Sequence, residues 1–155
     1  MTPQRLTSQK TQRNLGALHH LMNRLAPFTP SEFARISLPI HLSLESLKKG
    51  TGNYGDYADL ADAINVSMVR AEQIGPQAID MLGLARDAMV RTAKRFADTG
   101  RWGFDGPAIT EVTDAVDFYD QLLQLSTPLQ MHESINEVRR RCDRIRADKA
   151  KELHA

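Results

Sequence analysis

The spacing of apolar residues is the feature that most limits the fold of this chain. In segment after segment, apolar residues recur every three or four positions, which is the period of an α-helix that buries one face. The clearest series runs 4-3-4-3 through Met131, Ile135, Val138, Cys142 and Ile145. No stretch shows the sustained apolar–polar alternation of a half-buried β-strand. The pattern therefore predicts an all-α protein.

Proline and glycine divide this pattern into separate helices. Thr29-Pro30 and Thr127-Pro128 are each typical of an N-cap followed by proline in the first turn. The glycine-containing segments 51–55 and 100–107 are typical of loops. With a first helix at about 15–25, this punctuation predicts a single-domain bundle of about six helices joined by short connections.

Two further expectations concern individual helices. Pro39 lacks the N–H that an interior helical position donates, so we expect a break near Ser37-Leu38. The segment 77–98 has apolar residues on more than one face, which predicts a central position in the bundle.

Length and composition narrow the class of protein. The chain has 155 residues, 41% of them hydrophobic and 25% charged, and we expect residues 1–155 to form one domain. Residues 1–12 are expected to be a flexible basic arm and 148–155 a frayed tail. No apolar run has the roughly 18 residues of a membrane span, and the single Cys142 excludes an intramolecular disulfide. These features predict a soluble, cytoplasmic protein without membrane contact.

The formal net charge of +1 hides an uneven distribution. Residues 1–29 carry four basic side chains and no acidic one, and residues 138–155 also have a net charge of +4. The intervening 30–137 has a net charge of −7. Such ends can contact nucleic acid phosphates, contact the acidic middle of a second copy, or be solvated helix ends.

The last helix combines an apolar seam with a row of cations. Its candidate partner- or DNA-binding residues are Arg139, Arg140, Arg144 and Arg146. A cationic ridge beside an apolar seam suits a coiled-coil dimer that grips DNA, or a helix that docks on an acidic partner. The alternative is an end helix packed on its own bundle, which the interspersed acidic residues favour slightly.

Residues 57–74 resemble a helix-turn-helix. In that interpretation Ile64-Asn65-Val66 forms the turn, and Arg70 lies on the recognition helix. Asp59, Asp62 and Glu72 make this a poor surface for phosphate, and the same residues also fit one uninterrupted amphipathic helix.

The loop at 100–107 holds the only tryptophan. Trp102 beside Arg101 has the composition of a recognition surface, and both are candidate partner-binding residues. Alternatively, Trp102 and Phe104 plug the end of the bundle while Asp105 caps the next helix. We favour the plug.

Catalytic and metal-binding patterns find little support. The chain has no glycine-rich phosphate loop, no Gly-x-Ser-x-Gly and no metal-binding histidine pair on one helix face. His41 has no second metal-ligating residue at a suitable spacing. The aspartates at 114, 117 and 120 fit a solvated face. Cys142 fits a core or interface position. We therefore expect no enzymatic activity, no cofactor and no metal.

Four segments resemble parts of small helical proteins from proteobacterial plasmids, prophages and other mobile elements. They are the loop Gly100–Ala108, Asp120-Gln121-Leu122, Thr127–Met131 and Ala63–Val66. The resemblance extends from about 53 to 140 and implies an accessory or regulatory role in a bacterial cytoplasm. It supplies no catalytic or binding residues. The sequence thus predicts a non-enzymatic accessory or regulatory protein that acts through macromolecular contacts, as a homodimer with a protein partner or DNA. The alternative is a DNA-binding regulator using 57–74 or the basic ends.

Overall fold

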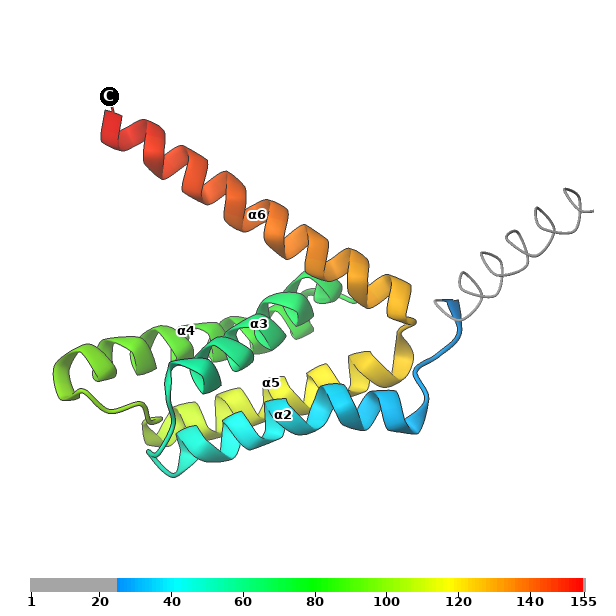
Figure 1. Ribbon diagram of the computed structural model, residues 1–155, viewed down its shortest axis with the longest axis horizontal. Coiled ribbons are helices and arrows are strands. Elements are labelled where there is room, and N and C mark those ends of the chain that lie inside the picture. The colour runs from blue at the N-terminus through cyan, green and yellow to red at the C-terminus, as the bar shows by residue number, and fades with distance from the viewer. Residues whose placement is uncertain (1–24, 155) are drawn as a thin grey trace, which may run out of the picture.

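The computed structural model describes residues 25–154. The expected arm at 1–12 and most of the expected helix at 15–25 lie outside these residues. The described part contains five helices and no strand, which confirms the all-α class (Figure 1). The helices are α2 (Pro30–Lys48), α3 (Tyr54–Ala71), α4 (Pro76–Thr99), α5 (Gly106–Leu125) and α6 (Pro128–His154).

Side-chain caps fix where three of these helices begin. Thr29 and Glu32 form a reciprocal capping box at the start of α2, with Pro30 in the first turn. Asn53 and Asp56 form a second capping box at α3. Asp105 accepts a hydrogen bond from the Ala108 amide at α5, as predicted.

The expected break at Ser37-Leu38 does not occur. Helix α2 runs through Pro39 without interruption, so fewer helices lie in this part of the chain than the sequence suggested. Leu38 and Pro39 are both exposed, whereas Ser37, Leu44 and Leu47 are buried against the other helices. The missing hydrogen bond therefore falls on the solvent side, and packing on both sides of the proline holds the helix together.

Helix α3 is the centre of the bundle, because it packs against α2, α4, α5 and α6. The prediction that 77–98 would be central is wrong: α4 packs on α3 and α5 and leaves Leu84 and Val90 exposed. The main core is built from the inner faces of α2 to α5, with side chains such as Leu47, Leu60, Leu82 and Val112 almost fully buried. Hydrophobic burial of this kind is the dominant stabilising contribution.

Helix α6 lies across this four-helix body. Figure 1 shows it starting near the end of α5, crossing α3 and continuing beyond the body to the C-terminus. A smaller cluster anchors its first turns, where Met131 and Val138 pack with Ala63, Val66 and Leu123. This arrangement positions the groove described next.

Candidate functional site

Helix α6 begins in a well-defined way. The Thr127 amide donates to Gln130 Oε1 over 3.0 Å, and the Gln130 amide donates to Thr127 Oγ1 over 3.3 Å. This is the reciprocal cap that the Thr-Pro-Leu-Gln sequence predicts, with Pro128 in the first turn. The helix direction is thus fixed at its start, close to the end of α5.

The apolar seam of α6 leaves the body partway along the helix. Met131 is only 4% exposed, but exposure rises to 36% at Ile135 and 56% at Ile145. Cys142, on the same seam, is also exposed, so the expectation of a core cysteine is wrong, and an interface position for it stays a prediction. The reason is geometric: a straight helix diverges from the body it crosses, so its later seam residues are not buried by the rest of the described chain (Figure 1).

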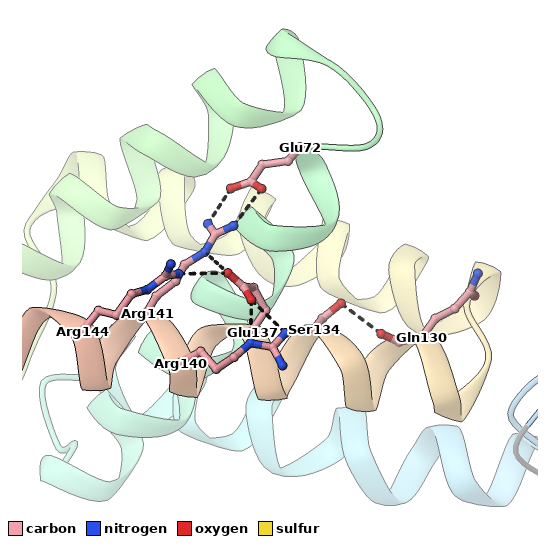
Figure 2. Close-up of polar contacts among 7 residues, drawn as sticks. All are labelled: Glu72, Gln130, Ser134, Glu137, Arg140, Arg141 and Arg144. Atoms are coloured by element: carbon pink, nitrogen blue, oxygen red, sulfur yellow. Dashed lines mark hydrogen bonds and ion pairs between the residues drawn. The ribbon is translucent and has the colours of Figure 1, made fainter.

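Charged side chains fasten α6 to the end of α3 (Figure 2). Arg141 donates two hydrogen bonds to the Glu72 carboxylate, 2.5 and 2.9 Å long, and a third to Glu137 over 2.9 Å. Arg141 lowers the pKa of both carboxyl groups below their ordinary values, with Arg140 adding to the effect at Glu137. These side chains are partly exposed, so their main effect is on the orientation of α6 rather than on stability.

The same network alters the predicted cationic ridge. Arg140 and Arg144 both donate to the Glu137 carboxylate, so one acid serves three arginines (Figure 2). Arg146 lies 3.8 Å from Asp143. Of the four predicted α6 arginines, Arg139 alone makes no ion pair within the described part of the chain. The ridge is therefore less positive than its sequence suggests.

An open groove of about 510 Å³ lies between α3 and α6. Its apolar lining comes mainly from Ile40, Ala63, Val66, Tyr119, Ile135 and Val138. Arg139, Cys142, Asp143 and Arg146 line it from α6, and Asp59 and Asp62 line it from α3. The groove thus combines an apolar floor with two carboxylates on the α3 wall and with two guanidinium groups and the Asp143 carboxylate on the α6 wall.

The α3 carboxylates are the most distinctive part of this groove. Asp59 accepts a hydrogen bond from Ser43 over 3.0 Å, and neither Asp59 nor Asp62 makes an ion pair within residues 25–154. Partial burial raises the pKa of Asp62 above its ordinary value, the charge of Asp59 raises it further, and the charge of Arg139 offsets part of this rise. A further cation placed here would favour the charged carboxylates. The sequence indicated these aspartates only as an obstacle to DNA binding.

The helix-turn-helix interpretation of 57–74 is wrong. Residues 57–71 belong to the continuous helix α3, with no turn at Ile64-Asn65-Val66. Ile64 and Val66 are buried in the two core clusters, and this packing on both sides of Asn65 favours an unbroken helix. The other interpretation, one amphipathic helix, is confirmed.

Arg70 therefore does not lie on a separate recognition helix, and its side chain has partners within the chain. Its guanidinium donates to Gln73 over 2.9 Å and lies 3.4 Å from the hydroxyl of Ser126 after α5. Its Nε is buried and has no hydrogen-bond partner within the described part of the protein. A half-buried side chain tied to the α5–α6 connection is poorly placed to reach a base edge.

Trp102 is the plug that the sequence favoured. Its ring stacks on Phe96 with centroids 4.1 Å apart and an angle of 8°, and Tyr57 lies at 4.7 Å. Phe104 is buried in the main core. Trp102 is half-buried, whereas Arg101 is exposed. Arg101 lines a hollow in which Trp102 takes no part, and the prediction that both bind a partner stays a prediction.

A polar cluster between α2 and α5 was missed. His41 Nε2 lies 2.7 Å from Asp120 Oδ2, and the Ser37 hydroxyl donates to Asp120 Oδ1 over 2.7 Å. The prediction of a solvated face is therefore wrong for Asp120, which is half-buried. The four-residue spacing of Ser37 and His41 puts them on one face, but only the packing of α2 on α5 supplies their partner.

Two kinds of feature are absent from residues 25–154. No group of three or more histidine, cysteine or acidic side chains is placed to hold a metal ion. No helix in the same range is long and apolar enough to cross a membrane.

Comparison with known proteins gives no family model that matches this chain, no curated protein similar to it and no solved structure that matches it. The groove between α3 and α6 must therefore be interpreted from its own geometry.

Proposed function

We propose that this protein is a non-enzymatic accessory or regulatory protein that acts through macromolecular contacts made by α6 and the groove beside it. We further propose that its first partner is a second copy of the same chain. The role as an accessory protein of a bacterial mobile element rests on the resemblance at 53–140 alone.

The exposed seam of α6 is the observation that carries the proposal. Cys142 and Ile145 continue the spacing of Met131 and Ile135, yet both are exposed. Residues 142–154 are all exposed or at the helix end, and a helix with so little tertiary support is marginal on its own in water. A partner that covers the seam would bury this apolar surface and hold the helix in place.

Charge and shape favour a second copy as that partner. A partner that fits this groove should present an apolar surface flanked by cations. The floor of the groove is apolar, and Asp59 and Asp62 make no ion pair within the described residues. The second half of α6 offers Ile145 next to Arg146. If each α6 lies in the groove of the other copy, a two-fold axis relates the two copies. The apolar contact of Ile145 and the ion pair of Arg146 are then each made twice.

The test is the oligomeric state in reducing buffer, measured by sedimentation velocity over a range of concentrations. The wild-type protein is expected to form a dimer. Ile145→Asp buries an unpaired charge in the proposed interface, so its dimer should dissociate at least about tenfold more readily. Ile145 is 56% exposed within one chain, so this change should leave the far-UV circular dichroism spectrum unaltered.

Leu125→Asp is the matched control, because Leu125 is also exposed but lies at the end of α5 and not on the α6 seam. It should leave the dimer intact. Asp62→Arg should weaken the dimer, and adding Arg146→Asp should restore it if these residues pair between copies. A wild-type protein that stays monomeric, or equal effects of Ile145→Asp and Leu125→Asp, would refute the second copy as partner.

DNA binding through the basic ends is the second candidate function. The net charge of +4 in residues 138–155 favours it, although Glu137 pairs with three of the arginines. Its test is fluorescence anisotropy of a labelled random-sequence duplex at low and near-physiological salt. This candidate requires an affinity that falls steeply with salt and is lost when 139–155 are removed. Weak or absent binding at low salt eliminates it.

A further inference from the structure

A second hollow of about 480 Å³ lies at the end of the bundle where α2 and α4 end. It is separate from the α3–α6 groove and shares no lining residue with it. Four basic side chains line it from three parts of the chain: Lys48 and Lys49 from the end of α2, Arg95 from α4, and Arg101 from the following loop. No acidic residue lines it.

A close backbone contact brings these cations together. The Phe104 amide donates to the Leu47 carbonyl over 3.1 Å, which holds the 100–105 loop against the end of α2. Gly103 packs so tightly on Gly50 that an added Cβ would lie 3.0 Å from the Gly50 Cα. The Arg95 guanidinium is oriented by a 3.3 Å hydrogen bond to the Phe104 carbonyl, and Arg101 Nη2 lies close to Gly50.

These cations are not required to satisfy the end of α2. The carbonyls of Glu45, Ser46 and Leu47 already accept hydrogen bonds from backbone amides at 49–51 and 104. Lys48 pairs with Glu45 over 3.0 Å, which accounts for one of the four charges. The remaining three, on Lys49, Arg95 and Arg101, make no ion pair within residues 25–154. The hollow therefore has an excess of positive side-chain charge, which exceeds what the partial negative charge at the C-terminal ends of α2 and α4 would balance.

We propose that this hollow is a binding site for a phosphate-class oxyanion carrying several charges. Two guanidinium groups and a lysine from separate elements suit the spread oxygens of such an anion, because arginine matches phosphate geometry and lysine adds a mobile point charge. Cations from three parts of the chain can contact more than one phosphate group at once, which favours an oligophosphate. The site does not depend on dimer formation.

The test uses inorganic tripolyphosphate as the probe and isothermal titration calorimetry at low salt as the measurement. The wild-type protein should show saturable binding. The double variant Lys49→Ala/Arg101→Ala should bind at least about tenfold more weakly, since two charge-assisted contacts are lost. In parallel, the backbone amide NMR signals of Gly50 and Gly103 should move in the wild-type protein on titration.

Arg35→Ala/Arg86→Ala is the matched control: it removes the same charge from two exposed sites that do not line the hollow. It should keep near-wild-type affinity, and Arg101→Lys should bind more tightly than Arg101→Ala. An absence of saturable binding refutes the proposal. An equal loss of affinity in the two double variants also refutes it, because binding would then respond to net charge alone. NMR signal changes confined to residues away from the hollow would refute it as well.

Discussion

At the scale of single residues, Asp105 shows how one side chain joins two structural tasks. Its Oδ1 caps α5 through the Ala108 amide, and its Oδ2 accepts a 3.1 Å hydrogen bond from Arg91 of α4. The Arg91 contact is the largest cause that holds the pKa of Asp105 below its ordinary value, and the Ala108 amide adds to it. The sequence predicted the cap but not the arginine, which lies one helix earlier and is brought near only by folding.

Asp105→Ala should therefore lower the free energy of unfolding by about 1–2 kcal/mol at neutral pH, mainly through loss of the cap. A carboxyl group whose pKa is lower in the folded state stabilises the protein above its unfolded-state pKa, and that stabilisation is lost as the pH falls through the folded value. The difference between wild type and variant should thus shrink from pH 7 to pH 3. Urea unfolding at both pH values measures it.

Asp105→Asn is the control, since an amide oxygen can still cap the helix but carries no charge for Arg91. Its stability should stay closer to wild type at neutral pH and depend less on pH. A full-sized loss for Asp105→Ala at pH 3 would contradict the assignment.

At the scale of elements, α2 shows where local rules give way to packing. Proline inside a helix removes a hydrogen bond and crowds the preceding turn, which is why a break was expected. In the structure the helix continues, because Ser37 and Leu44 on either side of Pro39 are buried against neighbouring helices. Tertiary contacts thus compensate for a locally unfavourable residue.

Pro39→Ala should stabilise the protein, because alanine restores the N–H donor and the helical propensity at an exposed position. The gain should be about 1–2 kcal/mol, less than the full propensity difference, since proline also restricts the unfolded chain. Chemical denaturation monitored by circular dichroism measures it. A less stable variant would show that the proline ring contributes packing that its exposure does not reveal.

At the scale of the whole molecule, the four-helix body and the projecting part of α6 differ in tertiary support. The body has a continuous core, whereas α6 is buried mainly at Met131 and Ser134 and is exposed throughout 142–153. The salt bridges of Arg141 hold α6 at the end of α3, and beyond them no α6 residue is buried against the rest of the described chain.

Removal of residues 147–155 should consequently leave the stability of the body unchanged to within about 0.5 kcal/mol. All described residues in this stretch are exposed, and none lines the α3–α6 groove. The truncated protein should lose only the corresponding helical signal and should still dimerise, because Ile145 and Arg146 are retained. Urea unfolding and sedimentation velocity measure the two effects. A large loss of stability would mean that the projecting helix packs on the body.

The sequence by itself determined the helical class and where several helices begin. Periodic apolar residues and side-chain caps act over three or four positions, so Thr29, Asp105 and Thr127 could be interpreted without knowledge of the fold. The plug formed by Trp102 and Phe104 also followed, because aromatic residues in a loop between helices gain most by covering the end of the core.

Only the tertiary structure decided which residues form sites. Asp120 meets His41 across a separation of 79 positions, Arg141 meets Glu72 across 69, and Lys49 shares a hollow with Arg95 and Arg101. Such pairings depend on how helices cross, and no local rule fixes that. The same reason explains the failures at 57–74 and at Pro39, where burial against distant helices outweighed local turn chemistry. Local interactions set the elements, and long-range packing set the groove, the hollow and the exposed seam of α6.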